Sequence, residues 1–333
     1  MNNPTVVFPA AKTVAIEDAS VPKPGDSDVV IRTSITLVSI GTELSILNGE
    51  YPAGSGWERY GKFPFNPGYN NIGTVVDVGS SVDKSFVGKR VATYGKHAAY
   101  ITSAASSLRM VPDGVSDEEA VFFTIAEIVM NGVRRSQVTW GEAATVFGLG
   151  LLGQFAARFA SLAGADVFAS DISDYRLSLL PKPVVTVNAA KEKLMDVVAA
   201  KTKSRMCDVA FEVTGDPDLI PGEFAMLRRQ GRFVVLSSPR GKTSFDFHDL
   251  CNAPSFTIIG AHNGSHPSVA SGENPWTQLR HAELYFDLVA EKRIDVKPLI
   301  TRTVPYTEAP KEYASLIRDR SSVMGILFDW KKI

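Results

Sequence analysis

Residues 141–171 read GEAATVFGLGLLGQFAARFASLAGADVFASD, which predicts an apolar strand, a glycine-rich turn, an alanine-rich helix and a second strand. In the turn, Gly148 permits a tight bend, Gly150 lets the backbone approach a pyrophosphate, and Gly153 lets the helix pack closely on the sheet. The free N–H groups of the helix N-terminus favour phosphate binding. A lone glycine pattern is weak evidence, but here it lies between a strand and a helix, as dinucleotide binding requires. We therefore expect a dinucleotide to bind at Gly148, Gly150, Leu151, Leu152 and Gly153.

Asp171 ends the second strand, where an acidic residue can accept hydrogen bonds from the adenosine ribose. The same carboxylate would repel a 2′-phosphate, so it favours NAD over NADP. Arg176 could in principle meet such a phosphate, but it falls in a predicted helix where a solvated arginine is the simpler interpretation. The alternative for Asp171 is a helix N-cap. We expect both residues to lie beside the adenosine half of NAD.

Two later strand ends supply further candidates. Thr214 follows the strand CDVAFEV, and Ser237 and Ser238 follow GRFVVL. Ligands of such folds bind at the carboxyl edge of the sheet, so we expect Thr214 to contact the adenosine half and the two serines to lie on the nicotinamide side. Ordinary strand-to-helix turns would explain each of them equally well.

The pattern of elements predicts an α/β fold with two kinds of domain. Residues 1–124 contain short strands broken by Gly and Pro, with a long loop over 48–67, which is typical of a β-rich domain. Residues 125–262 alternate apolar strands with helices, one of them through 222–230, and so predict a doubly wound parallel sheet. Residues 263–333 contain a helix over 277–293 and short strands.

Composition and charge favour a small-molecule partner. The chain has 35 basic and 36 acidic side chains, a balance that gives no attraction to nucleic acid or to an anionic membrane. Its two cysteines, Cys207 and Cys251, are far apart in sequence, which argues against a disulfide framework and a multi-cysteine zinc lobe. The N-terminus does not read as a signal peptide and no apolar run reaches about 20 residues, so we expect a cytoplasmic protein.

The chain resembles the medium-chain dehydrogenase/reductase superfamily over nearly all of its 333 residues. The resemblance rests on VSIGTELSILNGEYP, PGYNNIGTVVDVG, FVGKRVATYG, VPDGVSDEEAVFF, the glycine-rich segment and GRFVVLSS, in family order. It is closest to alcohol- or threonine-dehydrogenase-like proteins, including bacteriochlorophyllide dehydrogenases. It implies a GroES-like catalytic domain over 1–124, a Rossmann domain over 125–262 and a return segment over 263–333. It also implies a homodimer, or a dimer of dimers, in which the last Rossmann strand (FTIIGAH) pairs with its copy.

The sequence departs from the zinc-containing members where they hold their metal. Their Cys-Gly-Thr-Asp is Ile-Gly-Thr-Glu at 40–43, and their Gly-His-Glu is Gly-Tyr-Asn at 68–70. No cysteine lies near 122–127, and the four-cysteine lobe is absent. Zinc requires thiolate, imidazole or carboxylate ligands in a tetrahedral array, which Glu43 or Glu127 alone would not supply. We expect no metal.

Without zinc, side chains must handle the hydroxyl proton and the developing oxyanion. Thr42 matches the family position whose hydroxyl relays a proton, although it could simply stabilise a turn. Tyr69 and Asn70 replace metal ligands and should point into the same cavity, where a phenol can donate to a carbonyl oxygen or merely fill space. His97 should lie near the cleft mouth as a further candidate base, or be structural. Glu43 is expected to pair with an arginine.

These observations leave three functions open. The first is NAD-dependent hydride transfer (EC 1.1.1) to or from an alcohol, polyol or sugar-derivative carbon. The second is reduction of quinones or enones, which needs no Lewis acid; such relatives usually prefer NADPH, which Asp171 disfavours. The third is a coenzyme-binding protein that has lost catalysis.

Overall fold

The computed structural model describes residues 2–332, and the chain forms two compact units. Unit 1 is Met1–Thr124 with Ala282–Ile333, and unit 2 is Ile125–His281. The second boundary therefore falls after His281 and not after His262, where the sequence suggested it. The cause is a set of bonds to helix α4 (Phe123–Ser136): Asn131 donates to the His262 carbonyl at 3.2 Å, and Arg134 donates to His281 at 3.0 Å. Segment 263–281 thus belongs to unit 2.

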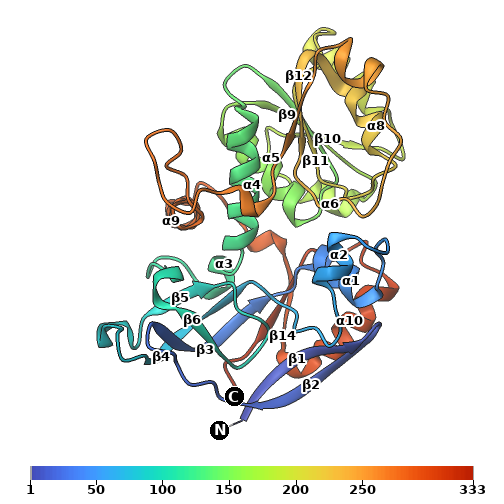
Figure 1. Ribbon diagram of the computed structural model, residues 1–333. Coiled ribbons are helices and arrows are strands. Elements are labelled where there is room, and N and C mark those ends of the chain that lie inside the picture. The colour runs from blue at the N-terminus through green and yellow to red at the C-terminus, as the bar shows by residue number, and fades with distance from the viewer. Residues whose placement is uncertain (1, 333) are drawn as a thin grey trace. The chain divides into compact units, whose positions relative to one another are not determined.

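Unit 1 contains a β-hairpin and a seven-stranded, mainly antiparallel sheet (Figure 1). The sheet order is β14-β15-β3-β4-β5-β7, with β6 also paired to β3. The strands are β1 (Asn2–Ala10), β2 (Thr13–Ser20), β3 (Asp28–Leu37), β4 (Asn71–Val78), β5 (Arg90–Thr93), β6 (Tyr100–Ala104), β7 (Arg109–Met110), β14 (Ile300–Pro305) and β15 (Gly325–Asp329). The helices are α1 (Ile40–Asn48), α2 (Gly56–Tyr60), α3 (Asp117–Ala120) and α10 (Ala309–Arg318).

Two local differences from the expectation for unit 1 concern helices. Residues 40–43 form the first turn of α1 rather than a bend, and the long loop over 48–67 includes α2. Helix α2 begins there because the Ser55 hydroxyl caps it, accepting the Glu58 N–H at 3.2 Å.

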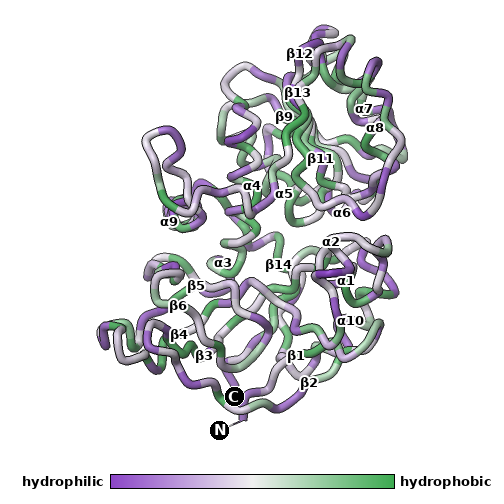
Figure 2. Tube along the Cα trace, in the orientation of Figure 1, coloured by the Kyte–Doolittle hydropathy of each residue, from purple (hydrophilic) through white to green (hydrophobic). Residues whose placement is uncertain are grey.

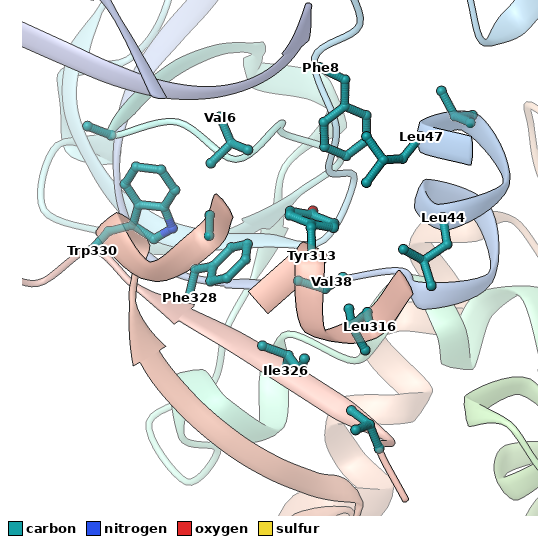
Figure 3. Packing of buried hydrophobic residues seen from close by; sticks show 14 residues of the cluster. Val6, Phe8, Val38, Leu44, Leu47, Tyr313, Leu316, Ile326, Phe328 and Trp330 are labelled. Atoms are coloured by element: carbon teal, nitrogen blue, oxygen red, sulfur yellow. The ribbon is translucent and has the colours of Figure 1, made fainter. Parts of the chain in front are cut away.

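An apolar core joins the two ends of the chain within unit 1 (Figure 3). Phe8, Tyr313 and Trp330 are fully buried, and the rings of Phe8 and Tyr313 meet edge to face with centroids 5.1 Å apart. Leu44 of α1 and Leu316 of α10 lie in the same cluster. Because an aromatic side chain buries a large area, this packing fixes α10 against α1 and places the Tyr313 hydroxyl beside the first turn of α1.

Unit 2 is a six-stranded parallel sheet in the order β10-β9-β8-β11-β12-β13. Numbered along the unit, this is the 3-2-1-4-5-6 order of Rossmann folds, with its crevice where the order reverses, between β8 and β11. The strands are β8 (Ala143–Phe147), β9 (Asp166–Asp171), β10 (Val185–Asn188), β11 (Cys207–Glu212), β12 (Leu227–Val235) and β13 (Thr257–Gly260). The helices are α5 (Leu151–Leu162), α6 (Asp174–Ser178), α7 (Leu194–Thr202) and α8 (Ile220–Glu223), while α9 (Gln278–Ala290) crosses the second boundary.

The predicted α/β class is confirmed. Figure 2 shows hydrophobic residues along the strands of unit 2, as expected for a sheet covered on both faces. Among the residues that the structure describes, no helix has the length and apolar character needed to cross a bilayer.

One expected helix is wrong. Residues 222–230 were expected to be helical, but α8 ends at Glu223, a 3-10 turn covers Phe224–Met226, and Leu227 already begins β12. Leu227 pairs with Cys207 on β11, and the register then shifts before Val209 meets Arg232. Burial of Leu227 in a cluster with Phe224 and Phe233 outweighs the helix propensity of the Leu-Arg-Arg-Gln stretch.

Candidate active site

The glycine turn after β8 has the geometry that a pyrophosphate needs. Gly148 has φ 84°, a left-handed conformation that favours glycine. A Cβ on Gly153 would lie 1.9 Å from the Gly148 carbonyl oxygen, so only glycine fits there. A Cβ on Gly150 would meet nothing within 4 Å, so this position faces open space. Gly150 is the N-cap of α5 and makes no side-chain cap, so the first-turn N–H groups at Leu151 and Leu152 are of the kind that can bind an anion.

Asp171 is buried at the end of β9 and is fixed by backbone donors. It accepts the Leu149 N–H at 2.7 Å and the Ser173 N–H at 2.9 Å, and Arg176 Nη1 lies 3.5 Å from its Oδ2. The N-cap of α6 is Ser173, so the N-cap interpretation of Asp171 is wrong. Arg176 is likewise an ion-pair partner of Asp171 rather than a merely solvated side chain. The structure therefore brings both residues to the glycine turn.

Thr214 and Ser237 bond to one buried carboxylate, and Thr214 also lies against the glycine turn. Glu212, fully buried at the end of β11, accepts the Thr214 hydroxyl at 2.8 Å and also the Ser237 hydroxyl. Thr214 Cα would be 3.1 Å from a Cβ on Gly148, whereas Ser238 is exposed. Sequence reasoning missed Glu212 as the organising group, although it stands directly before the predicted turn.

A second buried carboxylate near Glu212 makes the stability of unit 2 depend on pH. Glu223 is buried and, among residues 2–332, neither of its carboxylate oxygens has a hydrogen-bond partner. Burial, and then the charges of Glu212 and Asp216, raise the pKa of Glu223 to about 9. Because the pKa of Glu223 is higher in the folded state than in the unfolded chain, stability falls as the pH rises from about 4.5 towards 9.

Glu223→Gln, which mimics the protonated carboxyl, should therefore raise the melting temperature by about 4 °C or more at pH 8 and change it little at pH 4.5. Thermal unfolding at the two pH values checks this, with the exposed Glu192→Gln as the control. An equal shift at both pH values would show that the buried charge is not the cause.

Three hydroxyl groups meet in unit 1. The Tyr69 hydroxyl bonds to the Ser39 hydroxyl and lies 3.4 Å from Thr42 Oγ1. Tyr69 precedes β4, Ser39 is the N-cap of α1, and Thr42 is in its first turn. Burial raises the pKa of Tyr69 to about 12, and the hydrogen bonds from Ser39 and Thr42 offset that rise only in part. The phenol therefore carries its proton at neutral pH. We call Ser39, Thr42 and Tyr69 the hydroxyl trio.

The buried carboxylate of Glu43 fixes the trio through the backbone of Ser39. Glu43 accepts the Ser39 N–H at 3.0 Å and the Tyr313 hydroxyl, and lies 3.4 Å from His97 Nε2. Its partners are therefore these groups and not the arginine that was expected. His97 is fully buried and its Nδ1 bonds to Thr36 at 2.7 Å, so the expected position near a cleft mouth is wrong. Tyr313 was missed because only the packing of α10 on α1 brings it to Glu43, and Ser39 was missed because its place depends on where α1 begins.

The side chains at the former metal positions do not fit zinc. Ile40 packs on the apolar core of unit 1. The Asn70 amide nitrogen donates to the Leu37 carbonyl at 3.3 Å, and its Oδ1 has no partner in the described part of the chain. Within residues 2–332, no three His, Cys, Asp or Glu side chains gather closely enough to hold an ion. A carbonyl oxygen and a phenol are poor substitutes for the thiolate and imidazole that zinc prefers.

Two protein families match this chain. The alcohol dehydrogenase GroES-like domain matches residues 25–129, and the zinc-binding dehydrogenase family matches residues 152–277. The chain belongs to the medium-chain dehydrogenase/reductase superfamily. It is thus a dehydrogenase of the oxidoreductase class.

Similar proteins agree with this family and do not fix the coenzyme. The L-threonine 3-dehydrogenase of Chromobacterium violaceum is 24% identical over 97% of this chain and 98% of its own. A Sinorhizobium meliloti 1021 dehydrogenase solved with NADP has a TM-score of 0.82 at 18% identity, covering 99% of both chains. An Escherichia coli CFT073 alcohol dehydrogenase solved with NADH has a TM-score of 0.83 at 15% identity, covering 98% of this chain and 99% of that one. The shared fold therefore accommodates either coenzyme.

Proposed function

We propose that this dehydrogenase transfers hydride between NAD and an alcohol, polyol or sugar-derivative carbon without a metal ion. The hydroxyl trio carries the proposal. One member, Tyr69, stands where the resemblance places a metal ligand, and the trio offers a neutral phenol with two further hydroxyl groups.

The preference for NAD rests on Asp171. Its carboxylate lies at the glycine turn and can accept hydrogen bonds from the ribose hydroxyls, whereas a 2′-phosphate would be repelled. Arg176 neutralises part of this charge but is already paired with Asp171. In this proposal the glycine turn, Thr214, Ser237 and Ser238 hold the coenzyme.

The proposed chemistry assigns proton handling to the trio. Bound NAD supplies the hydride acceptor. The Tyr69 O–H donates a hydrogen bond to the substrate oxygen and protonates it when a carbonyl is reduced. A proton from solvent then returns to Tyr69 through the hydroxyl groups of Ser39 and Thr42, each of which accepts one proton as it passes one on. Glu43 acts as a positioning residue because it holds the Ser39 backbone, and His97 acts through its contact with Glu43. Asn70 holds the segment at Leu37 and is not assigned a proton.

The alternative is a reductase of quinones or enones. The lack of a zinc-like donor set at 40, 69 and 70 favours it, because conjugate reduction needs no Lewis acid. Asp171 argues for NADH as the donor in that case too.

We further propose that β13 pairs with its copy in a homodimer. It is an edge strand of the six-stranded sheet, and its Ile258 side chain is 43% exposed. An unpaired, partly apolar edge is a template for strand addition.

An activity screen tests the proposed function. Protein dialysed against EDTA should oxidise at least one alcohol, polyol or sugar derivative with NAD, with a higher kcat/KM than with NADP, and added zinc should not raise the rate. Turnover only of quinones or enones with NADH would favour the alternative. A rate that is lost on dialysis and restored by zinc would contradict the metal-free proposal.

A further inference from the structure

Unit 2 contains a cationic cluster that the proposed function does not use. Two guanidinium groups lie over the Trp276 ring. The Cζ atom of Arg134 is 3.1 Å from the ring centroid, and that of Arg280 is 4.0 Å from it. His281 stacks on the same indole, with centroids 5.4 Å apart and planes 14° from parallel. His266 bonds to His281 at 2.9 Å. We call Arg134, Arg280 and Trp276, with these two histidines, the arginine–tryptophan cluster.

Hydrogen-bond directions fix both histidines in the neutral form. Arg134 Nε can only donate, so His281 Nε2, 3.0 Å away, must accept. His281 Nδ1 therefore donates to His266 Nε2, and His266 Nδ1 donates to the Asn263 carbonyl at 2.7 Å. Burial lowers the pKa of His281 to about 3, and the surrounding cations lower it in the same direction. These hydrogen bonds from Arg134 through the two histidines to Asn263 orient the Arg134 guanidinium and add no negative charge.

Within residues 2–332, neither Arg134 nor Arg280 lies within ion-pair distance of a carboxylate. Burial, and then the charge of Arg280, lower the pKa of Arg134 to about 10. Arg280 also lies in the first turn of α9, where the helix dipole disfavours a cation. A bound anion would therefore stabilise the two like charges that the indole holds together at a helix N-terminus.

The cluster lies at the edge of unit 2 that holds the coenzyme turns. A Cβ on Gly132, two residues before Arg134, would be 2.6 Å from Leu236, which directly precedes Ser237. Asn131 holds the chain where it leaves β13, at His262 and Ser265. Segment 263–281, which carries Trp276 and Arg280, therefore starts from the carboxyl edge of the sheet, where ligands of such folds bind.

We propose that the arginine–tryptophan cluster binds an oxyanion, a phosphate or carboxylate group, and that this group belongs to the substrate. Guanidinium groups bind both anions through paired, charge-assisted hydrogen bonds. The Nε of Arg134 is committed to His281 and Nη1 of Arg280 donates to the Pro275 carbonyl at 3.4 Å, which leaves the two Nη groups of Arg134 and the other donors of Arg280 for the anion. Oxyanion binding stands on the cluster alone, whereas assignment of the anion to the substrate rests on the proposed function.

Titrations of the full-length protein without coenzyme test the binding. Sodium phosphate and sodium acetate, at constant ionic strength, should each be followed by tryptophan fluorescence, with Trp276→Phe identifying the responding ring. A saturable response that weakens about tenfold or more in Arg134→Gln and in Arg280→Gln is expected, because each change removes a charge-assisted bond. The exposed Arg229→Gln, a matched loss of one charge on unit 2, should leave it unchanged. Saturation by phosphate alone or acetate alone identifies the group.

Three results would overturn oxyanion binding: no saturable response to either anion, equal weakening in Arg229→Gln, or dissociation of an oligomer in the arginine variants without anion binding. The last result would assign the cluster to an interface between copies. Thermal melting of each variant shows whether it is folded, and Arg280→Gln is the safer of the two because Arg134 also donates to the buried His281.

A separate measurement tests the assignment to the substrate. Arg280→Gln should raise KM about tenfold for a phosphate- or carboxylate-bearing alcohol and leave KM unchanged for an uncharged one. Anion binding together with equal KM effects on both alcohols would refute only the substrate assignment. A lack of turnover with any alcohol would refute the proposed function and leave the binding result standing.

Discussion

Gly153→Ala is expected to abolish coenzyme binding, with NADH affinity reduced about 100-fold or more, and to lower the stability of unit 2. The added methyl would sit 1.9 Å from the Gly148 carbonyl oxygen, which is backbone and cannot turn aside. Helix α5 must then move away from the sheet, and its N-terminus moves with it. Since the first-turn N–H groups bind phosphate only from a fixed position, affinity and stability fall together. NADH titration by fluorescence and thermal melting measure the two effects.

Gly150→Ala is the matched control because its methyl meets no protein atom within 4 Å and its φ of −63° suits any residue. Its melting temperature should stay within about 2 °C of the original, while NADH affinity should still fall, because the methyl occupies space that the pyrophosphate needs. Unchanged NADH binding in both variants would show that the dinucleotide does not lie at this turn.

Most of unit 2 could be predicted from the sequence because the patterns that indicate it are local. The glycine spacing, the carboxylate of Asp171 and the apolar strands depend on residues close together in the chain. The expected helix over 222–230 failed where a long-range contact decided the outcome. Leu227 joins β12 through pairing with Cys207, twenty residues earlier, which no local periodicity reveals.

The site in unit 1 was harder to predict from the sequence because it is assembled from segments that are far apart in the chain. Thr42 and Tyr69 were found through their places in family motifs, and the structure brings them together. Ser39 completes the trio only because α1 begins at residue 40. Glu43 accepts a hydrogen bond from the Tyr313 hydroxyl, and the two residues are 270 positions apart in the sequence. This partner could therefore not be inferred from spacing. The same limit applies to the arginine–tryptophan cluster, in which Arg134 and Trp276 come from separate elements.

Tyr69→Phe is expected to lower kcat by about 10²–10⁴-fold, the range for loss of a general acid, while the Kd for NADH stays the same. The change removes only the hydroxyl at the centre of the trio and leaves the ring in place. Because the pKa of Tyr69 is raised to about 12, the phenol keeps its proton from pH 6 to 9. We therefore expect the rate of carbonyl reduction to show no ionisation of Tyr69 in that range. Steady-state rates with the substrate from the activity screen, together with their pH profile, check both points.

Tyr306→Phe is the matched control, because it also removes one phenolic hydroxyl, but from a ring that stacks on Trp330 with centroids 4.5 Å apart, outside the trio. It should retain full turnover. Thr42→Val should fall between the two variants, because Ser39 still supplies one hydroxyl to Tyr69. If Tyr69→Phe keeps the original kcat, the proton must reach the substrate oxygen from another group, and the trio has only a structural role. If kcat falls and the Kd for NADH rises equally, the hydroxyl supports the fold and not the chemistry, because a group used only in the transition state lowers kcat alone.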